Sequence, residues 1–283
     1  MNDMPRITAL YTYPVKSCAG IAHAQIALTP TGPEYDRRWM IGYDEGGKAL
    51  SQITQRDLPQ LALVQPTISG DSLILSAPGK SDLCVPLQDR ALKMTRITVW
   101  SDTVKAHDEG DEAAEWFSDY LNVDVRLMRM PDDFVRRVDT RYSPEFAQVG
   151  FADAYPLLLI SEASLEDLNE KLVARGKSPL PMNRFRPNVV VAGCEPFAED
   201  TWRRFSIDGI QFEGVKLCAR CVTTTVDQSR GEVVDKDEPL ATLATYRRRA
   251  GGKVMFGQNV VHRGLGTLKV GATLEVIPET AES

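Results

Sequence analysis

The stretch Lys216-Leu217-Cys218-Ala219-Arg220-Cys221-Val222-Thr223-Thr224-Thr225-Val226-Asp227 contains two cysteines three positions apart, followed at once by a β-branched run. Valine and threonine favour strands, so we expect Val222 to Val226 to form a buried strand that follows a cysteine loop. Arg220, between the cysteines, would stabilise a thiolate, which is the form of cysteine that binds metal. The stretch therefore predicts a loop that binds a soft metal, although two ordinary buried cysteines explain it equally well.

Two familiar Cys-x-x-Cys sites fit this stretch poorly. A redox pair of the thioredoxin kind begins a helix, whose dipole lowers the pKa of the thiol, whereas a strand-type run follows here. A zinc ribbon needs a second Cys or His pair at ligand spacing. The other cysteines, Cys18, Cys84 and Cys194, are scattered, and the three histidines stand alone. The sequence therefore argues against zinc.

Composition limits the class of protein. The 283 residues exceed the usual size of one domain, so we expect two domains or one large β-rich unit. A formal net charge of −6 without a basic stripe argues against nucleic-acid binding. The sequence has neither an apolar run long enough to span a bilayer nor the apolar core of a signal peptide. Five cysteines without a regular framework fit a reducing compartment. We therefore expect a cytoplasmic protein that binds no membrane.

Short β-type runs separated by turns dominate the first half, which favours a barrel or a sandwich. These runs include Leu61 to Val64, Leu73 to Ser76 and Ile97 to Trp100, and Asp44 to Gly47 is expected to be a hairpin turn. An amphipathic helix follows, whose buried face is predicted at Ala113, Trp116, Phe117, Tyr120 and Leu121. The predicted fold class is α+β and predominantly β, with domains at 1–125 and 126–283.

Three cationic segments have the composition of anion-binding sites. Lys16 and Ser17 follow a strand and combine a cation, a hydroxyl and free backbone amides. Arg37 and Arg38 fall in an expected strand, where neighbouring side chains point to opposite faces, so only one of them can face a shared site. Arg186 belongs to a third segment, directly before a buried-type strand. Ordinary solvated side chains are the alternative in each case.

In their order along the chain, these segments resemble the MOSC family, named for the molybdenum cofactor sulfurase C-terminal domain. The resemblance is to its two-domain members, the mitochondrial amidoxime-reducing components and the bacterial YcbX-type proteins, which carry a MOSC N-terminal β-barrel domain. The matching motifs span almost the whole chain. They are Tyr13-Pro14-Val15-Lys16-Ser17, Asp36-Arg37, Ser161-Glu162-Ala163-Ser164-Leu165, Phe185-Arg186-Pro187-Asn188, Cys218-Ala219-Arg220-Cys221, Thr224-Thr225-Val226-Asp227 and Phe256-Gly257-Gln258-Asn259.

The resemblance implies an N-terminal β-barrel domain and a MOSC β-barrel domain with flanking helices, which hold the molybdenum cofactor (molybdopterin) between them. It implies that Cys221 is the molybdenum ligand and a catalytic residue. The implied cofactor-binding residues are Lys16, Ser17, Arg37, Arg186, Ala219, Arg220 and Asn259. Position 219 departs from the family, which often has serine there. Pyridoxal phosphate is disfavoured as a cofactor. Asp227 is a second catalytic candidate, for proton handling, with a structural carboxylate at a strand end as the alternative.

The activity that the resemblance implies is molybdenum-dependent reduction of small N-hydroxylated compounds, namely amidoximes, hydroxylamines and N-hydroxylated bases, with detoxification as its role. The sequence has no dinucleotide fingerprint and no spare iron–sulfur or haem ligand set. Electrons would therefore come from a separate donor of the ferredoxin, flavoprotein reductase or cytochrome type. Two alternatives remain open: a non-catalytic carrier of the molybdenum cofactor, and a sulfur-transfer protein that uses a Cys221 persulfide.

Overall fold

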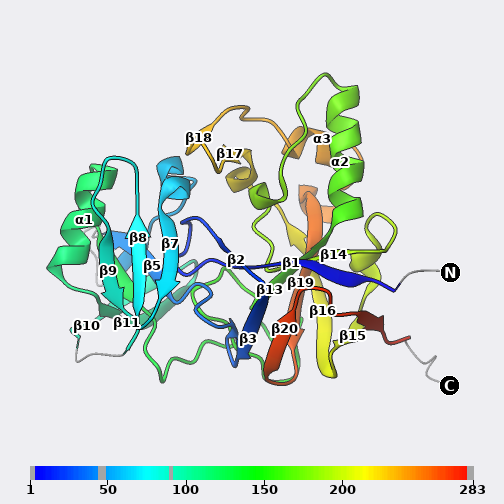
Figure 1. Ribbon diagram of the computed structural model, residues 1–283. Helices are drawn as coiled ribbons and strands as arrows, with labels where there is room; N and C mark the ends of the chain where they lie inside the picture. Colours follow the sequence, from blue (N-terminus) through cyan, green and yellow to red (C-terminus); the bar gives the residue numbers. More distant parts are fainter. Residues whose placement is uncertain (1–3, 44–48, 89–91, 279–283) are drawn as a thin grey trace.

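One half of the molecule is a closed five-stranded barrel (Figure 1). The structure is a computed structural model, and it describes residues 4–43, 49–88 and 92–278, so the hairpin turn expected at residues 44–47 lies outside the described residues. The barrel order is β10-β11-β12-β5-β6. Its strands are β5 (Trp39–Tyr43), β6 (Leu50–Gln52), β10 (Met94–Val99), β11 (Asp102–Asp108) and β12 (Arg126–Arg129).

A helix and a small sheet complete the barrel half. Helix α1 (Asp111–Leu121) buries Trp116 and Phe117 in the same core cluster as Trp39, which confirms the predicted helix and its apolar face. The 3₁₀ helix η1 (Pro59–Leu63) occupies most of the run predicted as a strand at Leu61 to Val64. That prediction was wrong because a proline at the first position favours a helical turn. The small sheet contains β7 (Gln65–Ser69), β8 (Ser72–Ser76) and β9 (Leu83–Pro86).

The other half is built on an eight-stranded sheet with the order β2-β1-β14-β13-β19-β16-β15-β21. The sequence predicted a barrel in this half. The start of β1 bonds to the segment at the beginning of β21, through an isolated bridge between Arg6 and Thr273 and a hydrogen bond from the Ile7 amide to the Ala272 carbonyl at 2.9 Å, so the sheet curls back on itself as a barrel does. The strands are β1 (Arg6–Thr12), β2 (Ile21–His23), β13 (Leu157–Ser161), β14 (Val189–Ala192), β15 (Arg204–Ile207), β16 (Ile210–Ala219), β19 (Met255–His262) and β21 (Leu274–Val276). Phe256 to Asn259 lie within β19. The overall fold class, predominantly β with few helices and a closed barrel in the N-terminal half, agrees with the prediction.

Helices cover the sheet on the side where the cysteine loop lies (Figure 1). Helix α2 (Glu162–Ala174) begins as predicted after Ser161, whose Oγ accepts a hydrogen bond from the Ser164 amide at 3.1 Å. Short elements fill the connections. They are α3 (Leu240–Ala244), η2 (Met182–Arg184), η3 (Ala198–Thr201), η5 (Ala250–Gly252), β17 (Val226–Asp227) and β18 (Glu232–Val233). None of the helices in the described ranges is long and apolar enough to cross a membrane.

The start of the chain ties the two halves together. Strand β1 pairs with β14, and β3 (Gln25–Thr29) pairs with β20 (Gly266–Lys269) and β4 (Gly32–Pro33). The chain then enters the barrel at β5 and leaves it through β12, which lies just after residue 125. Most of residues 4–33 therefore pack with the sheet half, although they precede the barrel in sequence, whereas Val15 and Cys18 lie in the core of the barrel half. The boundary between residues 125 and 126 itself stays a prediction.

The β-branched run after the cysteines is not the strand that the sequence predicts. Residues Val222–Thr225 form the 3₁₀ helix η4, and only Val226–Asp227 are extended, as β17. Threonine hydroxyls close this turn, because Thr224 Oγ1 donates to the Cys221 carbonyl at 2.9 Å and Thr225 Oγ1 donates to the Val222 carbonyl at 2.8 Å. Local side-chain bonds to the backbone thus override the β propensity of the run.

The atoms packed around Gly214 of β16 leave no room for a side chain there. A Cβ atom there would lie 2.1 Å from the Trp202 carbonyl oxygen and 2.4 Å from Gln258 Nε2. We expect Gly214→Ala to lower the free energy of unfolding by about 1–3 kcal/mol, since inserting one carbon into a packed region forces backbone shifts. Denaturant titration measures the change. Gly264→Ala is the matched control, because the nearest atom to its added Cβ is 3.9 Å away. Equal stability of both variants would contradict the packing described.

Candidate cofactor-binding cavity

A cavity of about 300 Å³ opens between the barrel half and the eight-stranded sheet. Loops from both halves line it. The lining comprises residues 16–17, Arg37, residues 54 and 56, residues 152–155, 157–158, 185–186 and 188, residues 216–221, Thr223 and Asn259. The last residues of β16 and Asn259 of β19 line the cavity next to the cysteine loop.

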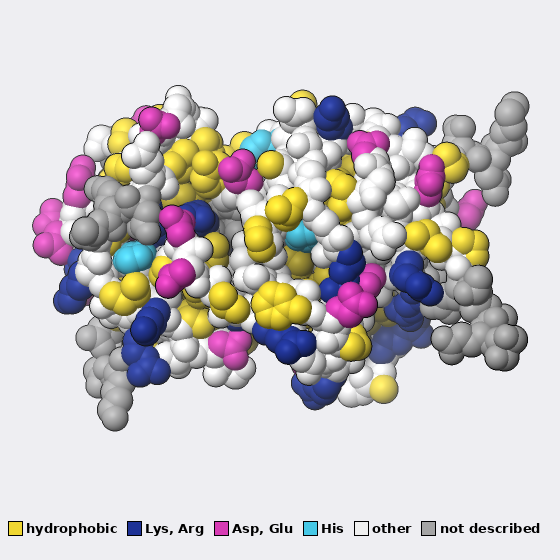
Figure 2. All heavy atoms as spheres, turned by 90° about the horizontal axis from the view of Figure 1, so that it is seen from below, with side chains coloured by type: hydrophobic (Ala, Val, Ile, Leu, Met, Phe, Trp, Pro, Cys, Tyr) yellow, Lys and Arg dark blue, Asp and Glu magenta, His cyan; other side chains and the backbone are white. Residues whose placement is uncertain are grey.

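The cavity is strongly cationic. Among the described residues that line it, Asp153 is the one carboxylate against six cations, which are Lys16, Arg37, Arg56, Arg186, Lys216 and Arg220. The face of the molecule seen in Figure 2 is different, because cationic, anionic and hydrophobic side chains are interspersed there. A concave surface lined by one sign of charge raises the local concentration of ligands of the opposite sign. The cavity therefore suits an anionic ligand.

Most of the predicted site residues meet in this cavity. Eight of them line it, and they come from five separate parts of the chain: Lys16, Ser17, Arg37, Arg186, Ala219, Arg220, Cys221 and Asn259. Two other candidate residues, Arg38 and Asp227, do not line the cavity. Arg38 forms an ion pair with Asp132, and Asp227 lies beyond η4. Arg37 was expected in a strand, but it lies in the turn before β5, with a φ of 46°.

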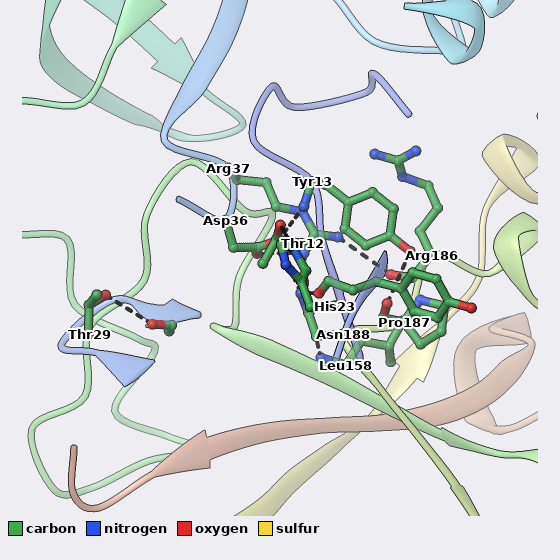
Figure 3. Close-up of polar contacts among 12 residues, drawn as sticks. Thr12, Tyr13, His23, Thr29, Asp36, Arg37, Leu158, Arg186, Pro187 and Asn188 are labelled. Carbon is green, nitrogen blue, oxygen red and sulfur yellow. Dashed lines mark hydrogen bonds and ion pairs between the residues drawn. The ribbon is translucent and has the colours of Figure 1, made fainter. Parts of the chain in front are cut away.

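Tyr13 holds two of the arginines in place. The guanidinium carbon of Arg37 lies 4.3 Å from the centre of the Tyr13 ring, and that of Arg186 lies 4.2 Å from it (Figure 3). The Tyr13 hydroxyl donates to the Pro187 carbonyl at 3.0 Å, which fixes the ring itself. Burial lowers the pKa of Arg186 to about 10, so Arg186 stays cationic at neutral pH. Cation–π contacts with a shared ring thus position like charges at one site.

A buried carboxylate organises the same region. Asp36 accepts hydrogen bonds from the Tyr13 amide at 2.8 Å, Arg37 Nη1 at 2.6 Å and Asn188 Nδ2 at 3.0 Å. Asn188 also donates to the Tyr11 carbonyl at 3.1 Å (residues of this cluster are drawn in Figure 3). Burial raises the pKa of Asp36, and the charge of Arg37 offsets part of this rise. The network joins the turn before β5 to the loop before β14.

Backbone conformation singles out three of the predicted residues. Eight non-glycine residues in the described chain have a positive φ, and Ser17 (71°), Arg37 (46°) and Arg186 (54°) are among them. This left-handed conformation is unfavourable for residues with a Cβ and persists where the surrounding structure enforces it. Such residues concentrate at functional sites. The enrichment is independent of the charge of the cavity.

The two cysteines of the loop have different surroundings. Arg220 Nη1 lies 3.0 Å from the Sγ atom of Cys218, and Arg220 Nη2 donates to the Phe185 carbonyl at 2.7 Å. The sequence left open which cysteine the arginine would stabilise, and the structure places it against Cys218. Cys221 is exposed to the cavity, and its Sγ atom lies 3.4 Å from Thr223 Oγ1. Cys221 is thus the more accessible thiol of the two.

Arg184 holds the turn that follows the cysteine loop. It is buried, and its Nη1 donates to the Thr225 carbonyl at 2.8 Å, at the end of η4. Its Nη2 donates to Asp227 at 3.1 Å, and Asp227 also accepts from the Ser229 hydroxyl at 2.7 Å. Hydrogen bonding from Ser229 is the main cause that lowers the pKa of Asp227. These contacts are those of a structural carboxylate, the alternative that the sequence left open, and a catalytic role for Asp227 stays a prediction.

Lys16 reaches the cavity from a buried position. Its Nζ atom lies 2.8 Å from Asp153 Oδ1, with 8% of the Lys16 side chain and 58% of the Asp153 side chain exposed. Burial lowers the pKa of Lys16, and the charge of Asp153 partly offsets this effect. A buried ammonium group with a single carboxylate partner has capacity for further acceptors, because it carries three donors.

Sequence reasoning missed several residues that build the cavity. Gln55 and Gln228 exchange side-chain hydrogen bonds at 3.0 and 2.9 Å, and Gln55 also donates to the Ser17 carbonyl at 2.7 Å. This amide pair connects the barrel half to the segment after η4. Asp153 was missed as well, since it lies in a long loop without periodicity. Tyr13 and Asn188 stood inside the motifs that were recognised, but nothing in those motifs showed that they hold other residues in place.

The donor set fits a molybdopterin-type cofactor. Such a cofactor carries a phosphate and a metal that prefers sulfur ligands, and the cavity offers cations together with the accessible Cys221 thiol. Arg220 Nε is buried and has no hydrogen-bond partner among the described residues, so it retains donor capacity. Within the described ranges, no three His, Cys, Asp or Glu side chains gather as a metal site. The accessible Cys221 thiol and the cationic lining together make the cavity suitable for such a cofactor.

Comparison with known families agrees with this architecture. Residues 4–124 match the family described as MOSC N-terminal beta barrel domain, and residues 147–275 match the MOSC domain. The chain therefore belongs to the MOSC family, in the two-domain form with a MOSC N-terminal β-barrel domain.

Relatives with established names match the chain over most of its length. The chain is 36% identical to mitochondrial amidoxime reducing component 2 of Bos taurus, over 87% of this chain and 74% of that protein. It is 35% identical to mitochondrial amidoxime-reducing component 1 of Mus musculus and 34% identical to that of Homo sapiens, in both cases over 96% of this chain and 82% of the relative. Among solved structures, the YuaD protein of Bacillus subtilis aligns over 96% of this chain and 95% of that one, at 13% identity and a TM-score of 0.44.

Arg186 and Arg38 provide a matched pair of substitutions. We expect Arg186→Ala to weaken cofactor binding about tenfold or more, because a charge-assisted hydrogen bond contributes about 1.5–3 kcal/mol. Molybdenum and pterin content per purified chain measures the effect. Arg38→Ala should leave this content unchanged, since Arg38 pairs with Asp132 outside the cavity. If the cofactor-free Arg186→Ala protein melts far below the wild type, Arg186 is a structural residue and the assignment fails.

Proposed function

We propose that this protein is a molybdenum-cofactor-dependent reductase of N-hydroxylated compounds such as amidoximes and hydroxylamines. The observation that supports it most is the convergence of an accessible thiol, Cys221, with six cations in one cavity. The relatives named amidoxime-reducing components support the reaction class. In this reaction the N–O bond breaks, two electrons and two protons are consumed, and the oxygen leaves as water.

Different residues of the cavity would hold different parts of the cofactor. Cys221 would bind the molybdenum, because thiolate is a soft ligand. The phosphate and the pterin ring would be held by the cations and polar groups around it, which are Lys16, Ser17, Arg37, Arg186, Ala219, Arg220 and Asn259. When bound, the cofactor supplies the two-electron centre that accepts the oxygen of the substrate. The network of Tyr13 and Asp36 would keep the cationic side chains in position before the cofactor arrives.

Electrons would come from a separate protein of the ferredoxin, flavoprotein reductase or cytochrome type. The chain has no Gly-x-Gly-x-x-Gly fingerprint, and its five cysteines are all free in the structure. Free cysteines also support a location in a reducing compartment, for which we propose the cytoplasm. Relatives from animals carry the word mitochondrial in their names, so fractionation of the source cells is the test of location.

The two cysteines should respond differently to substitution. We expect Cys221→Ser to abolish molybdenum binding, because a hydroxyl is a poor replacement for a soft thiolate. Cys218→Ser should retain most of the metal, since a serine hydroxyl can still accept a hydrogen bond from Arg220. Molybdenum analysis of both purified variants is the measurement. Equal loss in both would indicate a two-cysteine site, and full retention in both would remove Cys221 from its proposed role.

Electron supply provides the direct test of the activity. Molybdenum-loaded protein with NADH alone should not reduce benzamidoxime, whereas addition of a reduced viologen should start turnover at once. Appearance of benzamidine measures the reaction. Turnover with NADH alone would show that the protein has a further cofactor site, which the sequence analysis did not predict. If no donor supports turnover, tightly held molybdenum would favour the cofactor carrier, and a persulfide on Cys221 without metal would favour the sulfur-transfer protein.

A further inference from the structure

Asp153 differs in charge from the other ionisable residues of the cavity. It is the one carboxylate among the described residues that line the cavity, where it faces six cations. An anionic cofactor is repelled by such a group. Asp153 pairs with Lys16, whose Nζ lies 2.8 Å from its Oδ1 atom, and its charge partly offsets the effect of burial on the pKa of that lysine. The rest of the carboxylate is exposed and can accept hydrogen bonds from a second ligand.

The carboxylate is available to such a ligand. Its side chain is 58% exposed, and the solvent that reaches it is that of the cavity, since Ala152, Asp153 and Ala154 all line the same space. One oxygen is 2.8 Å from Lys16, the Trp100 side chain also donates a hydrogen bond to the carboxylate, and a carboxylate has about four acceptor positions in total. Further donors can therefore bind without displacing the lysine.

Neighbouring side chains suit the body of an aromatic or aliphatic molecule. Tyr155, two residues after Asp153, lines the cavity together with Leu157 and Leu158. Pockets for small molecules commonly combine apolar walls with a few polar groups that fix the orientation. Cys221, the proposed metal ligand, lines the same cavity. A molecule whose N–H groups meet Asp153 thus shares the cavity with the proposed metal position.

We propose that Asp153 is the substrate-binding residue that accepts hydrogen bonds from the amino group of amidoxime-type substrates and from the amidinium group of their products. This assignment rests on the proposed function, because it names the part of the substrate that the same cavity recognises. An amidine is planar and offers parallel N–H donors, the geometry that a carboxylate binds in the manner of an arginine side chain. N-hydroxylated molecules without such N–H groups would gain nothing from Asp153.

The test uses benzamidine, the cationic product of benzamidoxime reduction, with molybdenum-loaded protein and isothermal titration calorimetry. We expect Asp153→Asn to raise the dissociation constant of benzamidine at least about tenfold, since hydrogen bonds to a charged group contribute more than a tenfold change in affinity. Asp132→Asn is the matched control, because Asp132 is an exposed aspartate of the same loop that pairs with Arg38 outside the cavity. It should bind benzamidine like the wild type.

Two further measurements distinguish a role of Asp153 in substrate binding from a role in cofactor binding. Asp153→Asn should raise the KM of benzamidoxime more than it lowers kcat, and its molybdenum content should equal that of the wild type. Benzamidine binding equal to the wild type would overturn the assignment, and so would a loss of molybdenum as large as in Lys16→Ala, which would make Asp153 a partner for the cofactor lysine. If no donor supports reduction by the wild type but benzamidine binding still depends on Asp153, the proposed function fails and the binding site stands.

Discussion

The buried Asp36 carboxylate is the contact on which the cavity depends. Its hydrogen bonds to the Tyr13 amide, Arg37 and Asn188 join a turn of the barrel half to the loop that carries Arg186. A buried charge is costly unless its partners are complete, and here three donors satisfy it. Removing any one donor would leave the charge poorly compensated, so the two halves of the molecule are locked in a single arrangement at this point.

That arrangement explains how like charges can gather in one place. Arg37 and Arg186 share the Tyr13 ring, and both have a left-handed backbone that the surrounding contacts enforce. Both the backbone strain and the repulsion between the arginines cost stability in the protein alone. An anionic ligand would relieve the repulsion. The cavity thus favours the binding of a ligand at a cost in the stability of the protein, which is usual at functional sites.

The ligand loop is held by a different device. Arg184 donates to the end of η4 and pairs with Asp227, and Cys221 lies directly before this 3₁₀ turn. Thr224 and Thr225 close the turn with their hydroxyls. The residues that follow the cysteines thus serve to present a thiol to the cavity. A preorganised ligand limits the entropy that is lost on binding.

Much of this could be predicted from the sequence. Apolar periodicity gave α1 its buried face, and the ordered motifs identified the family and gathered eight residues that line one cavity. The strand predicted after Cys221 failed because threonine has both β propensity and a hydroxyl that can close a helical turn, and composition alone does not decide between them. The strand predicted at Arg37 failed because only the contacts of Asp36 reveal the turn. Asp153 could not be predicted, since nothing in a loop sequence shows which cavity its side chains enter.

We propose that the thiol of Cys221 binds molybdenum inside this cavity. Crystal diffraction from the cofactor-loaded protein, recorded on both sides of the molybdenum absorption edge, locates the metal. We expect one anomalous peak in the cavity, within bonding distance of Cys221 Sγ, with cofactor density that extends toward Arg37 and Arg186. A peak bonded to Cys218 Sγ instead, or a peak outside the cavity, would contradict it.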